Sequence, residues 1–168
     1  MSASSGPVST LPDERRLRVK MRAILCSLTF MAALASADPF SGTWVLNLSK
    51  SRLPPPLPRK QISYIEANST SIRIREQIVN DKGEEMNIIV DAKFDGKDYP
   101  IVGSPFVDTV AYERVDSHTL KGTVKKAGQV VTTETAIVSQ DGKTLTGTYS
   151  GTDLNGKRVN AVAVFDKQ

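Results

Sequence analysis

Residues 71–93 read SIRIREQIVNDKGEEMNIIVDAK, and this stretch decides the fold. Its apolar residues recur at every second position on both sides of Asp81-Lys82-Gly83, which is the pattern of two half-buried β-strands joined by a tight turn. Gly83 tolerates the positive φ that such hairpin turns need. The stretch therefore predicts an antiparallel hairpin with strands near 71–80 and 84–94.

Turns of the same kind punctuate the rest of the chain after residue 37. Because short links join strands that lie side by side, the pattern predicts an antiparallel up-and-down meander. Closure into a barrel would hide the edges of such a sheet. We therefore predict an all-β fold of about ten strands closed into a barrel, with a two-sheet β-sandwich as the alternative. The predicted strands lie near residues 42–48, 60–67, 71–80, 84–94, 98–103, 108–115, 119–126, 129–138, 144–150 and 157–165.

The segment before these strands has the organisation of an export signal. A basic start is followed by an apolar run over residues 23–34 and by Ala-Ser-Ala at 35–37, the small-x-small pattern that signal peptidase accepts. The run is too short to cross a bilayer as a stable helix. We predict an N-terminal extension and signal peptide over 1–37 and a single β-barrel domain over 38–168. The mature chain would have no transmembrane segment and would be periplasmic or extracellular.

Charge and cysteine content limit the partners of this domain. The net charge of the chain is +4, but residues 1–37 hold five basic and two acidic residues, so the predicted mature chain is almost neutral. It has no electrostatic reason to bind nucleic acid. The single cysteine, Cys26, lies in the leader, so the domain folds without disulfides. Leu25 is larger than the residue that precedes a lipidated cysteine, so we expect no lipid anchor at Cys26. The sequence leaves open whether Met1 or Met21 is the start, and it leaves the oligomeric state open.

Alternation also sorts the side chains by face. The early strands carry large apolar residues on one face, and burial of each contributes roughly 1.5–3 kcal/mol, so this face becomes the interior. The later strands carry smaller residues at the positions predicted to point inward. Because small residues opposite large ones can leave space in a barrel, we predict an internal cavity. The large inward residues include Trp44, Leu46, Leu48, Ile72, Ile74, Val90 and Val124, and the small ones include Gly122, Thr133, Thr135, Gly147, Ala161 and Ala163.

One carboxylate shares the predicted inward face. Glu76 alternates with Ile74 and Ile78, and an unpaired carboxylate in an apolar interior must shift its pKa or find a partner. It is either a polar anchor for a ligand or a residue that a bulge turns to solvent. Residues 54–58, Pro-Pro-Pro-Leu-Pro, cannot pair in a sheet. They form either a stiff loop across one end of the barrel or a lid or docking segment.

The start of the first strand resembles a known family. Residues 40–44 read Phe-Ser-Gly-Thr-Trp, and Gly-x-Trp at this place is similar to the opening signature of lipocalins and the wider calycin group. The resemblance implies that Gly42 and Trp44 close the barrel floor and that a basic side chain from near the C-terminus covers the indole. Lys167 is positioned for that role.

A longer likeness extends over nearly all of residues 38–168. Residues 40–51, 95–105 and 165–168 resemble a set of small secreted bacterial lipocalin-like proteins, which to our knowledge has no assigned activity. The resemblance implies a lipocalin-like barrel and an exported protein, with ligand binding by analogy only.

Motifs for catalysis and for metal binding are missing from the sequence. His118 is the only histidine, and Asp116-Ser117-His118 is interpreted as a hairpin turn, because adjacent residues rarely aim at one another as a catalytic triad does. With no cysteine after the leader, we expect no zinc site and no cofactor.

The first functional hypothesis is a non-enzymatic exported barrel that binds a small apolar ligand in its cavity. One alternative is a packed interaction module of the cell envelope that uses the proline-rich loop, and another is an isomerase or lyase with Glu76 as a buried base. The predicted ligand-binding residues are Leu46, Tyr64, Ile74, Glu76, Met86, Ile88, Phe94, Tyr112, Leu120 and Tyr149.

Overall fold

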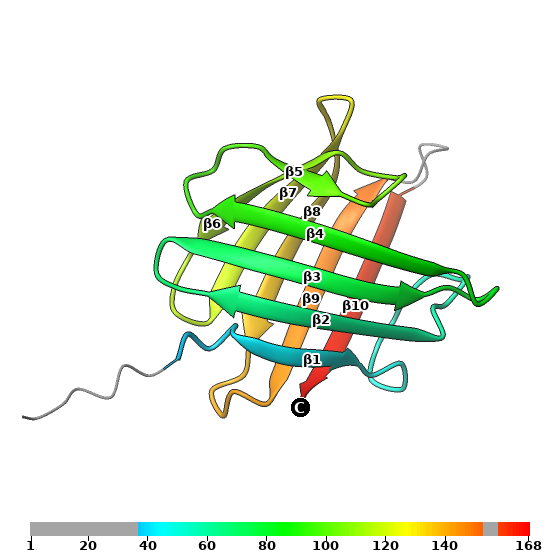
Figure 1. Ribbon diagram of the computed structural model, residues 1–168, viewed down its shortest axis with the longest axis horizontal. Coiled ribbons are helices and arrows are strands. Elements are labelled where there is room, and N and C mark those ends of the chain that lie inside the picture. Colours follow the sequence, from blue (N-terminus) through cyan, green and yellow to red (C-terminus); the bar gives the residue numbers. More distant parts are fainter. Residues whose placement is uncertain (1–36, 153–157) are drawn as a thin grey trace, which may run out of the picture. The chain divides into compact units, whose positions relative to one another are not determined.

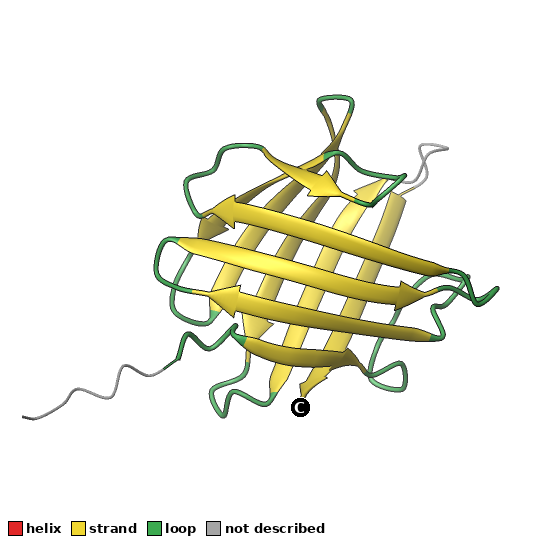
Figure 2. Cartoon of the chain, in the orientation of Figure 1, coloured by secondary structure: helices red, strands yellow, loops and turns green. Residues whose placement is uncertain are grey.

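The computed structural model describes residues 37–152 and 158–168. Residues 1–36 of the predicted leader, and the predicted turn at 155–157, lie outside the described residues. Within the described ranges the chain forms strands joined by loops and turns, without a helix (Figure 2). The strands are β1 (Gly42–Leu46), β2 (Lys60–Ala67), β3 (Ser71–Val79), β4 (Glu85–Lys93), β5 (Tyr99–Val102), β6 (Thr109–Arg114), β7 (Thr119–Lys126), β8 (Gln129–Val138), β9 (Thr144–Thr152) and β10 (Arg158–Lys167).

The strands form one closed antiparallel barrel. Each strand pairs with the strand before it and the strand after it, and β1 pairs with β10 to join the two edges. In Figure 1, strands β1 to β4 cross in front of β8 to β10, so the inward faces of both groups enclose the interior. The predicted meander barrel is confirmed, and the sandwich alternative is wrong because no sheet edge is left between β1 and β10.

The predicted hairpin at residues 71–93 is present. β3 and β4 pair without interruption from Ser71 opposite Lys93 to Val79 opposite Glu85. The alternate residues Ile72 and Val90 are buried, whereas Arg73 pairs with Asp91 on the outer face. Alternation of apolar and polar residues therefore sets the inner and outer faces of this half of the barrel.

Strand β8 corrects a prediction. Thr133 and Thr135 lie on the outer face, where they line a surface hollow with Lys121 of β7. Counting back from the turn at Ala127-Gly128 would place Val124 opposite Val131, but a bulge shifts the register, and Val124 lies opposite Thr132. One extra residue exchanges the two faces of a strand. The inward residues of β8 are Thr132, Glu134, Ala136 and Val138. In β1, Leu48 is also exposed rather than inward, since the strand ends at Leu46.

One end of the barrel, the closed end, is filled by aromatic side chains. Trp44 and Phe40 are fully buried, and the indole Nε1 donates a hydrogen bond to the Phe40 carbonyl at 2.8 Å. The Lys167 Nζ lies 4.8 Å from the centroid of the Trp44 ring. A Cβ at Gly42 would come within 2.5 Å of the Lys167 Cε, and Gly42 has φ +143°, so glycine is needed where the lysine crosses.

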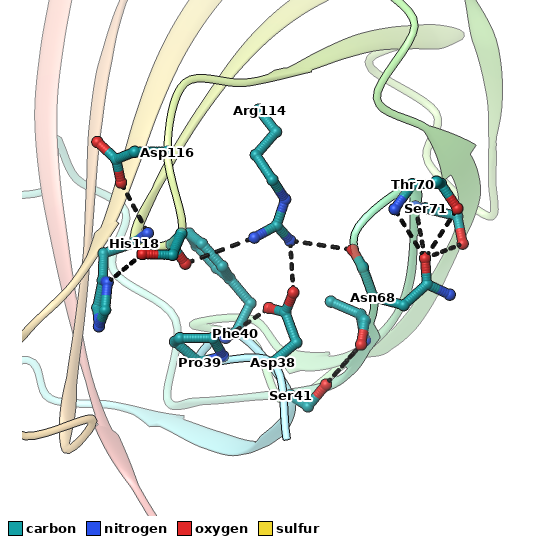
Figure 3. Close-up of polar contacts among 12 residues, drawn as sticks. Asp38, Pro39, Phe40, Ser41, Asn68, Thr70, Ser71, Arg114, Asp116 and His118 are labelled. Carbon is teal, nitrogen blue, oxygen red and sulfur yellow. Dashed lines mark hydrogen bonds and ion pairs between the residues drawn. The ribbon is translucent and has the colours of Figure 1, made fainter. Parts of the chain in front are cut away.

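Arg114 secures the same end from the opposite side of the barrel (Figure 3). Its guanidinium pairs with the Asp38 carboxylate at 2.8 Å and lies 4.5 Å from the Phe94 ring centroid and 5.5 Å from that of Phe40. It also donates to the Asn68 carbonyl in the β2–β3 turn at 3.3 Å. A partly buried charge is tolerated here because it is paired and stacked on aromatic rings.

The opposite end, the open end, is bordered by the long β1–β2 loop. Arg52 bridges to Val162 of β10, and Leu53 turns its side chain toward the interior. Residues 54–57 are exposed. The proline-rich segment is therefore a loop at the rim of the barrel, tied to β10 just before it begins.

Candidate functional site

The interior between the closed end and the open end is hollow. A cavity of about 430 Å³ lies among the inward faces of β2 to β10, and small-molecule sites usually measure roughly 300–1,000 Å³. The packed-module alternative required a filled interior, so the cavity removes its premise. Leu53 and Val107 line the cavity at the open end. Its apolar wall is formed by Ile74, Ile88, Val90, Ile101, Val110, Val124, Ala161, Ala163 and Phe165.

Glu76 of β3 points into this cavity. Its Oε1 accepts hydrogen bonds from the Ser63 hydroxyl at 3.0 Å and from the Gln61 amide at 3.4 Å, both on the neighbouring strand β2. Burial raises the pKa of Glu76, and the two hydrogen bonds oppose this rise. The interpretation in which a bulge turns Glu76 to solvent is therefore wrong, because β3 is regular through this position.

A second carboxylate lies on the other side of the interior. Glu134 of β8 is partly buried, and its side chain lies over Gly122, where a Cβ would be 2.5 Å from the Glu134 Oε1. The pKa of Glu134 is raised to about 7: burial raises it most, a hydrogen bond from the Tyr112 hydroxyl lowers it, and the charge of Glu76 adds to the rise. Glu134 thus exchanges its proton near neutral pH.

Two tyrosines complete the polar part of the cavity wall. Burial, together with the charge of Glu134, raises the pKa of Tyr112 and of Tyr149 well above the usual value, so both hydroxyls stay protonated at neutral pH. The Tyr149 hydroxyl lies close to Gly147, where an added Cβ would be only 2.7 Å away. Glycine at position 147 makes room for that ring.

These four residues form a polar belt, defined here as Glu76, Tyr112, Glu134 and Tyr149. All four line the large cavity, and all four also line a second space of about 80 Å³ that adjoins the closed end. Among the described residues that line the two spaces there is no lysine, arginine or histidine. The belt thus places two carboxylates, without a basic partner in the lining, in a mainly apolar interior.

The structure brings together five of the ten predicted ligand-binding residues in the cavity wall. They are Ile74, Glu76, Ile88, Tyr112 and Tyr149.

Leu120 lies deeper, in the wall of the small space. Leu46 packs against the core, Phe94 lies under Arg114, and Met86 lies near the β3–β4 turn, so none of the three is in the cavity wall. Tyr64 is 39% exposed on the outer face, since Ser63 and Ile65 are the buried residues of β2, and its predicted place in the cavity is wrong.

Glu134 is the residue of the cavity wall that the sequence did not indicate. In β8 both alternating sets carry threonine and valine, so hydrophobicity does not distinguish the inner face from the outer one. The bulge near Lys125 then reverses the facing that the turn implies. Glycine at position 122, directly opposite Glu134 in the pairing, was the signal that a large side chain lies there.

Other parts of the described chain offer less chemistry. A hollow of about 450 Å³ on the outer face of β2 to β4 is lined by exposed charged residues such as Arg73 and Lys93, which water solvates. Residues 116–118 form the β6–β7 turn: the Asp116 carboxylate accepts from the backbone of His118, not from its ring (Figure 3). In the described ranges, no group of three or more metal-ligating side chains is found, and no helix is long and apolar enough to cross a membrane.

Comparison with known proteins gives a likeness in fold. No family model matches the chain, and no curated protein matches it in sequence. Among solved structures, the barrel is similar to the crystal structure of zebrafish ileal bile acid-binding protein complexed with cholic acid. The TM-score is 0.50 at 14% sequence identity, over 77% of this chain and 99% of that chain. The likeness is one of fold, a closed antiparallel barrel that in this chain has ten strands.

Proposed function

We propose that this protein is a non-enzymatic carrier that binds a small, largely apolar molecule inside its barrel. The observation that carries the proposal is the cavity of about 430 Å³ whose wall is apolar apart from the polar belt, Gln61 and Thr132. A cavity of this kind binds a ligand by removing apolar surface from water, while a few polar groups orient the molecule.

Two further observations support the proposal. The similar zebrafish barrel was crystallised with cholic acid, so a barrel of this fold has room for a molecule of that size. The open end, bordered by Leu53 and Val107, offers a ligand a route into the cavity on the side away from the closed end.

We also propose that the protein is exported to the periplasm or the extracellular space of a bacterium. The predicted cleavage site after Ala37 supports this proposal. The first residue beyond it, Asp38, supplies the carboxylate that pairs with Arg114, so cleavage there would leave the contacts of the closed end complete. Detection of the mature N-terminus by mass spectrometry in a periplasmic extract would test it, and an uncleaved chain in the cytosol would contradict it.

Binding can be tested with Nile red, a neutral apolar dye whose fluorescence rises in apolar surroundings. We expect saturable binding by the wild type and at least about tenfold weaker binding by Ile88→Trp, because the larger ring occupies the cavity. Ile89→Trp is the matched control, since Ile89 is the next residue and is 41% exposed on the outer face. Equal binding by the two variants, or no saturable binding by the wild type, would contradict an internal site.

A second candidate function is proton transfer on a bound molecule, with Glu134 as the general base. The observation that favours it is the pKa of about 7, which suits an acid–base group at neutral pH. Deuterium incorporation next to the carbonyl of 2-decanone, followed by NMR, tests it. Enzymatic exchange that is lost in Glu134→Gln would support the candidate, and exchange at the buffer rate would remove it.

A further inference from the structure

The polar belt places two carboxyl groups in the cavity where the bound molecule would lie. Glu76 enters from β3 and Glu134 from β8, and the charge of one raises the pKa of the other, so the two carboxylates act on the same region of the cavity. Two carboxylates held in an apolar interior without a basic partner are costly to ionise. A positively charged group between them would offset that cost.

The hydrogen-bond partners of the two carboxylates also favour a positively charged donor in the ligand. The Glu76 Oε1 accepts from Ser63 and Gln61, and Glu134 accepts from Tyr112. An ionised carboxylate can accept about four hydrogen bonds, so both groups keep capacity for a donor. A ligand carboxylate would meet like charges here, whereas an ammonium group supplies up to three N–H donors.

We propose that the cavity selects molecules with an apolar body and a primary or secondary amine, whose ammonium group is bound by the carboxylates of Glu76 and Glu134. This inference rests on the proposed carrier function and names the ligand class. It sets this barrel apart from its zebrafish neighbour, whose structure holds cholic acid, which is itself an acid.

The inference has a pH dependence with a definite sign. An alkylamine stays protonated up to about pH 10, as a lysine side chain does, so its charge is constant between pH 6 and 9. Glu134 loses its proton as the pH rises through about 7. The titratable groups that face it are Glu76, Tyr112 and Tyr149, and the two tyrosines stay neutral over this range. Amine binding therefore strengthens from pH 6 to pH 8.

The test uses three probes with the same ten-carbon chain: decylamine, decanol and decanoate. Binding of each to the full chain is measured by calorimetry at pH 8, at concentrations below micelle formation. We expect decylamine to bind at least about tenfold more tightly than either of the others, which is the scale of charge-assisted hydrogen bonds. Glu134→Gln and Glu76→Gln should each reduce decylamine binding about tenfold and change decanol binding much less. Both changes preserve shape and remove a buried charge, so the variants should fold.

Glu66→Gln is the matched control, because Glu66 is exposed on the outer face of β2. It should leave the binding of all three probes unchanged. If decanol or decanoate binds as tightly as decylamine, the amine preference is wrong while the carrier function stands. If none of the three probes binds, both the inference and the carrier function are overturned. Weakening of decylamine binding by Glu66→Gln equal to that by Glu134→Gln would place the amine on the surface and also overturn the inference.

Discussion

The closed end and the hollow half of the barrel are built from the same strands, but they differ in whether their charged side chains have partners of opposite charge. At the closed end the guanidinium of Arg114 is paired with Asp38 and stacked on two aromatic rings. In the hollow half Glu76 and Glu134 line the same cavity, and the described lining holds no basic side chain. Pairing offsets the cost of burying the Arg114 charge, whereas a carboxylate ionised in the cavity without a basic partner lowers stability. Carboxyls with raised pKa in a cavity are typical of functional sites.

The packing of the two regions differs in the same way. Trp44, Phe40, Leu120 and Val138 are fully buried around the closed end. Some residues around the cavity, such as Val110 and Val90, are buried as well. Ile74, Ile88 and Val124 are only partly buried, so they lack contact atoms on the side of the cavity. We infer that the closed end stabilises the fold and that the hollow half carries the function. The predictions below test this division, from the largest expected effect to the smallest.

Truncation of an aromatic side chain at the closed end should have the largest effect on stability. Trp44→Ala should lower the free energy of unfolding by about 3–5 kcal/mol, because it leaves a large void in tight packing. Ile88→Ala in the cavity wall should cost only about 1 kcal/mol, because one side of Ile88 already lacks contacts. Urea unfolding followed by circular dichroism measures both. Equal costs would show that the two regions contribute alike to stability.

Loss of the Arg114 charge should come next. Arg114→Ala should cost about 3 kcal/mol, since it leaves Asp38 without its partner and Phe40 without its stacked guanidinium. Arg73→Ala is the control, because Arg73 pairs with Asp91 at 49% side-chain exposure. It should cost less than about 1 kcal/mol. A similar loss in both variants would contradict the buried role of Arg114.

The hollow half should give the protein an unusual dependence of stability on pH. The pKa of Glu134 is about 7 in the folded chain, above its ordinary value of 4.5, so the folded state holds this proton more tightly than the unfolded state. The contribution of Glu134 to stability is therefore fully present below about pH 4.5 and is lost as the pH rises through about 7, by up to about 3 kcal/mol.

Glu134→Gln should largely flatten this decline and should stabilise the protein at pH 8. The unfolding free energy between pH 5 and pH 8 measures the effect. Constant stability of the wild type over that range, or an equal decline in the variant, would contradict the raised pKa. The raised pKa of Glu76 contributes in the same direction, so a small decline remains in Glu134→Gln.

The smallest effect should come from the hydroxyl of Tyr112. It donates to Glu134 and lowers the pKa of that carboxyl, so Tyr112→Phe should move the titration of Glu134 to higher pH with little change in fold. NMR of the Glu134 side chain measures the midpoint. A midpoint that moves to lower pH would contradict the hydrogen bond.

The fold could be predicted from the sequence because the patterns that indicate it are local. The alternation in residues 71–93 and the glycine-containing turns are enough to predict hairpins, and sequential hairpins of this number close into a barrel. The resemblance at residues 40–44 implied that Lys167 covers the indole of Trp44. In the structure the Lys167 Nζ lies 4.8 Å from the centroid of the Trp44 ring.

Only part of the site could be predicted from the sequence. Ile74, Glu76 and Ile88 lie in strands with clear alternation, so their facing could be predicted. Glu134 lies in strand β8, whose two faces carry residues of similar hydrophobicity. The strand follows a bulge that the local sequence does not predict. The role of Arg114 was equally hidden, because its partner Asp38 is distant in sequence and the pair forms only when the barrel closes.

The most direct test of the division is methyl NMR of the protein titrated with decanol. The account predicts that methyl signals of Ile74, Ile88 and Val110 shift saturably, because these residues line the cavity. Signals of Val138, which is packed near the closed end, and of Val102 on the outer surface should not move. Shifts confined to Val102, or equal shifts of Val138 and Ile88, would contradict a hollow binding half beside a solid closed end.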